Sequence, residues 1–77
     1  MVKPKVDSET KDARFKRIAS ARTSRILDDL RLLGNCANTS HYCYTENEVG
    51  KIFAAIEKEL KRTKSLFNTQ LTEFSLE

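Results

Sequence analysis

Apolar side chains recur at spacings of three and four residues along two long stretches of this chain. That spacing places them on one face of an α-helix, which advances about 100° per residue. The first apolar face consists of Phe15, Ile18, Ile26, Leu30 and Leu33. The second consists of Val49, Ile52, Phe53, Ile56, Leu60 and Phe67. The sequence therefore predicts two amphipathic helices, at residues 10–33 and 46–67.

The ends of these helices have their own signals. Thr45 and Glu48 have the spacing of a capping box, in which each side chain accepts a hydrogen bond from the other residue's backbone N–H. Gly34 is expected to end the first helix, because glycine adopts the left-handed conformation there without steric cost. Four residues could cap the start of the first helix: Asp7, Ser8, Thr10 and Asp12.

The remaining segments have little periodicity. We expect a flexible N-terminal segment at residues 1–9, a loop at 34–44, and a C-terminal tail at 68–77 that is frayed or forms one short helical turn. Two Gly and one Pro are few for an all-β chain, which needs many turns. The expected fold class is therefore all-α.

A short link between two long helices predicts an antiparallel two-helix hairpin. One pair of helices covers only part of both apolar faces, and in a chain of 77 residues this partial burial roughly balances the entropy of ordering. A second copy would complete the core as a four-helix bundle, so we expect a homodimer. The alternative is a monomer in which the tail, or the segment before residue 10, packs as a third element.

The chain has no apolar run approaching the roughly 18 residues of a membrane span, and its N-terminus has no apolar segment typical of a secretory signal. We therefore expect no membrane partner, a cytoplasmic location and reduced cysteines.

The net charge of +3 is unevenly distributed, because residues 1–33 contribute 9 − 5 = +4 and residues 34–77 contribute 5 − 6 = −1. The predicted basic face lies on the outer side of the first helix and its flanks: Lys11, Arg14, Lys16, Arg17 and Arg25. It could bind nucleic-acid phosphates or an acidic protein. Against nucleic acid, Asp28 shares the face and no aromatic side chain stands there to stack on bases.

Cys36, His41 and Cys43 lie together in the predicted loop. Thiolates and imidazole bind zinc, but structural zinc sites have four ligands with paired short spacings, and this loop has three without such a pair. A disulfide is disfavoured in the cytoplasm, and no third group orients a Cys–His catalytic pair. We expect no metal, no cofactor and no catalysis, with Cys36 and Tyr44 packed under the turn.

Other polar residues have expected structural roles. Arg22 lies within the apolar face of the first helix, where a guanidinium needs a partner. It could pair with Glu57 or Glu59, bond Asn side chains or loop carbonyls, lay its methylenes over apolar surface, or recognise a carboxylate or phosphate. Asn35 and Asn38 could bond backbone groups in the turn or adopt positive φ.

Three runs of sequence are distinctive: RLLGNCAN at 31–38, YCYT at 42–45 and VGKIFAAIEKEL at 49–60. With them, residues 15–67 resemble a group of short helical-hairpin proteins of Gram-positive bacterial chromosomes and mobile elements. The resemblance implies a cytoplasmic, non-enzymatic accessory protein and brings no catalytic residue. The expected function is thus a small helical protein-interaction or accessory protein with an unidentified protein partner. The alternative is a nucleic-acid-binding accessory factor.

Overall fold

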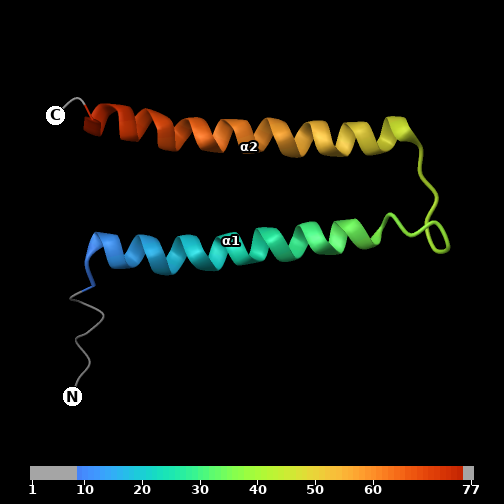
Figure 1. Ribbon diagram of the computed structural model, residues 1–77, viewed down its shortest axis with the longest axis horizontal. Helices are drawn as coiled ribbons and strands as arrows, with labels where there is room; N and C mark the ends of the chain where they lie inside the picture. Colours follow the sequence, from blue (N-terminus) through green and yellow to red (C-terminus); the bar gives the residue numbers. More distant parts are fainter. Residues whose placement is uncertain (1–8, 76–77) are drawn as a thin grey trace, which may run out of the picture. The chain divides into compact units, whose positions relative to one another are not determined.

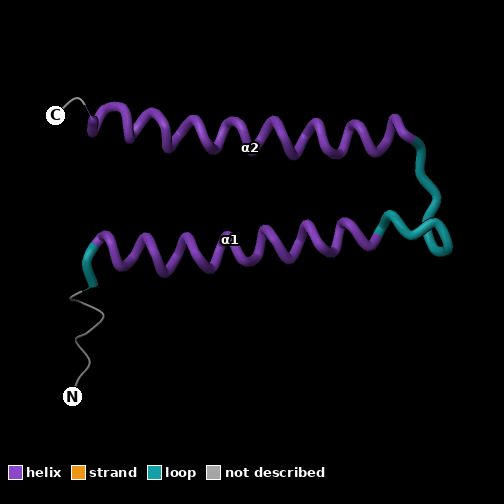
Figure 2. Tube along the Cα trace, viewed as in Figure 1, coloured by secondary structure: helices purple, strands orange, loops and turns teal. Residues whose placement is uncertain are grey.

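The computed structural model describes residues 9–75 of the chain. This part consists of two α-helices, α1 (Lys11–Asn35) and α2 (Glu46–Ser75), and has no strand (Figure 1). Residues 36–45 form the loop between them (Figure 2). The all-α prediction is confirmed. The helices belong to two separate units, Met1–Tyr42 and Cys43–Glu77; the antiparallel hairpin and its dimer stay predictions.

Thr10 caps the start of α1. Its backbone is extended, with φ −76° and ψ 165°, and its Oγ1 accepts a hydrogen bond from the N–H of Ala13 at 3.0 Å. The Thr10 carbonyl accepts from the N–H of Arg14 at 2.9 Å. The bond to Oγ1 satisfies the N–H of Ala13, one of the backbone donors that have no partner within the helix in a first turn. Of the other three candidates, Asp12 lies inside the helix, and residues 7 and 8 fall outside the described part of the chain.

The prediction that Gly34 ends α1 in the left-handed conformation is wrong. α1 continues to Asn35, and Cys36 caps it with right-handed angles, φ −72° and ψ −8°. The N–H groups of Cys36 and Ala37 donate to the carbonyls of Leu33 and Gly34, at 2.9 and 3.1 Å. These tighter bonds satisfy carbonyls of the last turn, so no left-handed residue is needed. Positive φ is absent throughout the described residues, Asn35 and Asn38 included.

The capping box at the start of α2 is confirmed. The Thr45 N–H donates to Glu48 Oε1 at 2.9 Å, and the Glu48 N–H donates to Thr45 Oγ1 at 3.1 Å. Both acidic residues of the first turn, Glu46 and Glu48, lie at the positive end of the helix dipole.

The predicted end of the second helix at residue 67 is wrong, because α2 continues to Ser75. Leu71 and Phe74 follow Phe67 at spacings of four and three, so they extend the apolar periodicity. No Gly or Pro interrupts the chain after Gly50. The tail predicted at 68–77 is therefore helical up to residue 75. Its last two residues, and residues 1–8 of the predicted N-terminal segment, lie outside the described part of the chain.

Neither helix has a buried side chain among the residues described. Along the apolar faces Ile18, Leu33, Val49 and Ile56 are half-buried. Phe15 and Ile26, by contrast, are 55% and 58% exposed. Within residues 9–75, no helix combines the length and the apolar character that crossing a bilayer requires. The described helices thus leave much of their apolar faces in contact with water.

Candidate functional site

The apolar face of α1 contains all five residues predicted for it. At about 100° per residue, Phe15 and Leu33 share one direction, and the others lie within about 60° of it. Two charged residues interrupt the face: the predicted Arg22, about 20° from Phe15, and Asp29, about 40° away. Both are exposed. The sequence analysis missed Asp29 because it defined the face by apolar residues alone. The spacing of seven residues between Arg22 and Asp29, which puts both on one side of a helix, could have indicated it.

The apolar face of α2 contains all six predicted residues and continues beyond them to Leu71, which is 60% exposed. Thr63 is a polar residue within this apolar face, and its side chain is half-buried. Its Oγ1 donates to the carbonyl of Glu59 at 2.9 Å. Because this bond satisfies the hydroxyl inside the helix, the methyl group of Thr63 can contribute apolar surface to the face.

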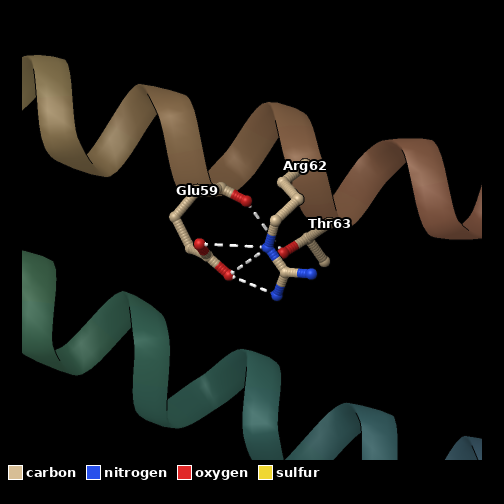
Figure 3. Close-up of polar contacts among 3 residues, drawn as sticks. All are labelled: Glu59, Arg62 and Thr63. Carbon is tan, nitrogen blue, oxygen red and sulfur yellow. Dashed lines mark hydrogen bonds and ion pairs between the residues drawn. The ribbon is translucent and has the colours of Figure 1, made fainter.

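An arginine pairs with a glutamate beside that position (Figure 3). The Nε and Nη2 atoms of Arg62 donate to Glu59 Oε2 at 3.0 and 2.6 Å. Hydrogen bonding to Arg62, helped by its positive charge, lowers the pKa of Glu59. The same hydrogen bonding, helped by the carboxylate charge, raises the pKa of Arg62. Glu59 was one of two acids predicted to pair with Arg22, and it is engaged within its own helix instead.

The predicted basic face is partly neutralised by neighbouring acids. Arg17 makes two hydrogen bonds of 2.8 Å to the carboxylate of Glu9. This contact lowers the pKa of Glu9, with a smaller contribution from the charge of Arg14, and raises the pKa of Arg17. Lys16 pairs with Asp12 at 3.4 Å.

The remaining basic residues do not form one cluster. Arg14 and Arg25 lie within about 20° of each other around the helix, about 16.5 Å apart along it. Lys11 lies about 40° from Phe15 and about 60° from Arg14, between the apolar face and the basic face. Of the arginines predicted for the basic face, Arg14 and Arg25 thus make no ion pair with another described residue of α1.

The loop is built from local backbone hydrogen bonds. Asn38 organises it: its Oδ1 accepts from the N–H of Ser40 at 2.9 Å, and its carbonyl accepts from the N–H groups of His41 and Tyr42. The prediction that Asn38 bonds backbone groups in the turn is confirmed. Asn35 takes part through its backbone carbonyl, which accepts from the N–H of Asn38 at 3.3 Å.

The cysteines of the loop are free thiols, and both are exposed. Cys36 Sγ lies 4.0 Å from the carbonyl of Leu32, and Tyr44 is 41% exposed. The prediction that Cys36 and Tyr44 pack under the turn is therefore wrong, because the local hydrogen bonds close the turn without an apolar core. No three Cys, His, Asp or Glu side chains of the described residues gather closely enough to hold a metal ion.

A shallow, open hollow runs along one side of α2. It is lined by Glu57, Leu60, Lys61, Lys64, Ser65 and Asn68. This lining mixes one carboxylate with two ammonium groups, an amide and a hydroxyl, and it places no thiol or imidazole beside them. The chemistry of the hollow resembles a solvated helix surface rather than a catalytic centre.

No protein family, no curated protein and no solved structure matches this chain. The resemblance to short Gram-positive proteins therefore stays a prediction. What supports a functional proposal is the arrangement of side chains on α1 and α2.

Proposed function

We propose that the protein is a small, non-enzymatic helical accessory protein that associates with itself through its apolar faces. In this proposal two copies of an antiparallel hairpin form a four-helix bundle in the cytoplasm. The outer side of α1 is left for an unidentified protein partner.

The observation that supports this proposal is the exposure of the apolar faces. Most large apolar side chains of the two faces, among them Leu30 at 41% and Phe15 at 55%, are exposed, and no described side chain is buried. Burial of apolar surface contributes a stabilising free energy of about 25 cal/mol per Å². A chain that keeps such faces in water gains little against the entropy of ordering 77 residues. Association would supply the missing burial.

Size-exclusion chromatography with light scattering tests the proposal. We expect a mass twice that of the chain at micromolar concentration, together with cooperative thermal unfolding followed by circular dichroism. A protein that stays monomeric and still unfolds cooperatively would refute self-association.

The alternative function is binding of nucleic acid by the basic side of α1. The observation that favours it is the alignment of Arg14 and Arg25, since neither makes an ion pair with a described residue of α1. The ion pairs of Lys16 with Asp12 and of Arg17 with Glu9 weaken the case for nucleic-acid binding, because they neutralise part of the basic face. It predicts salt-dependent binding to duplex DNA, with a shallower salt slope after Arg14→Gln and Arg25→Gln. No binding at low salt would eliminate this function.

A further inference from the structure

Arg22 and Asp29 interrupt the apolar face of α1 between Phe15 and Leu33. Seven residues separate them, which is about 10.5 Å along the axis. They are therefore too far apart to pair with each other within one helix. Among residues 9–75 the ion pairs of α1 are made by other side chains, and neither Arg22 nor Asp29 takes part in one. Opposite charges in an apolar face need partners if that face is to be covered.

We infer that the apolar face of α1 binds the same face of α1 in a second copy of the chain, with the two helices antiparallel. In this contact Arg22 of each copy pairs with Asp29 of the other. The inference rests on the proposed self-association and specifies which helix mediates it, in which direction and with which charges.

The spacing of the residues brings the charges together. When Phe15 of one copy lies opposite Leu33 of the other, Ile18 lies opposite Leu30, and two-fold symmetry repeats both contacts. Arg22 is then offset by three residues, about 4.5 Å along the axis, from Asp29 of the second copy. Side chains on a helix lean toward its N-terminus. In antiparallel helices these two side chains therefore lean toward each other and close the offset.

The same charges exclude other arrangements. A parallel pair of helices would place Arg22 against Arg22 and Asp29 against Asp29, and such like-charge contacts oppose association. A purely acidic partner would satisfy Arg22 and leave Asp29 unpaired. A partner must instead offer an anion and a cation at the same spacing of seven residues. A second copy of α1 offers both.

Charge reversal and exchange test the inference on the full chain. Arg22→Asp and Asp29→Arg, each alone, should weaken the dimer about tenfold in sedimentation equilibrium, because the lost pair occurs twice. The double variant Arg22→Asp with Asp29→Arg should return the dissociation constant to the wild-type value. Asp28→Arg is the matched control, since Asp28 lies on the opposite side of α1, and it should leave the dimer unchanged.

The outcomes separate the two proposals. A wild-type chain that stays monomeric refutes the self-association itself. A wild-type dimer that both single variants leave intact, or that the double variant fails to restore, overturns only the pairing of α1 with α1. Circular dichroism of each variant shows whether it keeps its helices. If a single variant unfolds, recovery of both helicity and dimer in the double variant supports the pairing, and failure to recover contradicts it.

Discussion

Gly34 lies in the last turn of α1 with ordinary helical backbone angles, and a methyl group added at its Cα would meet no atom within 4 Å. Gly50, in the first turns of α2, is equally open. Glycine has more backbone freedom to lose on folding than alanine, so a helical glycine with free space around it weakens its helix.

Gly34→Ala and Gly50→Ala should therefore each raise the free energy of unfolding by about 0.5–1 kcal/mol. Urea denaturation followed by circular dichroism measures the change. Gly50 serves as the control for an ordinary helical position. If Gly50→Ala stabilises the protein while Gly34→Ala destabilises it, Gly34 adopts the left-handed conformation after all.

A second prediction at this scale concerns the ion pair of Glu59 with Arg62. Because the hydrogen bonds from Arg62 lower the pKa of Glu59 from its ordinary 4.5, the pair stabilises the fold above that pH. The contribution is lost as the pH falls through the lower pKa of the folded protein. Glu59→Gln removes the titrating group, so this variant should lose less thermal stability than the wild type between pH 6 and about 3.

Glu57→Gln is the matched control, since Glu57 makes no ion pair with another described residue of α2. It should keep the acid sensitivity of the wild type. Equal acid sensitivity in the wild type and in Glu59→Gln would show that the pair does not contribute.

At the scale of the helices, the two elements and the cap of α2 could be predicted from the sequence, because periodicity and capping depend on residues close together in the chain. Thr45 and Glu48 are three residues apart, and their reciprocal bonds form as expected. The end of α2 was misplaced because residues 68–75 have only two large apolar residues, Leu71 and Phe74, among polar ones. Continuation of an existing helix is easier than nucleation, so weak periodicity suffices there.

A proline in the last turns tests this extension of α2. Gln70→Pro removes a backbone donor and clashes with the preceding turn, which costs about 3 kcal/mol in a helix interior. We expect a loss of helical circular dichroism and of thermal stability. Gln70→Ala is the control and should keep both. A frayed tail would tolerate the proline without change in either signal.

The site at this scale was predicted less completely than the fold. The apolar faces follow from spacing alone, but ion pairs depend on which rotamers meet. The sequence could not indicate which acid each arginine binds, because several acids lie at a similar distance along the chain. The structure pairs Arg17 with Glu9 and Arg62 with Glu59. These pairs decide which charges remain for a partner, and on the basic side of α1 they leave the arginines Arg14 and Arg25.

At the scale of the whole molecule, the proposed assembly makes stability depend on concentration. Dilution should lower the thermal midpoint of the wild type. Ile56→Asp places a charge in the apolar face of α2 and should abolish both the dimer and the cooperative transition. Ala54→Asp, about 160° away around the helix, is the control and should change neither by much. A midpoint that is the same at every concentration would contradict the assembly.

The absence of a buried side chain in the described residues has a consequence for the living cell. If the chain acquires its interior only by meeting another copy, its abundance acts as a threshold. Newly made molecules below that threshold would be open to proteases, while those above it would shelter one another. A modest change in expression would then switch the population between rapid turnover and persistence.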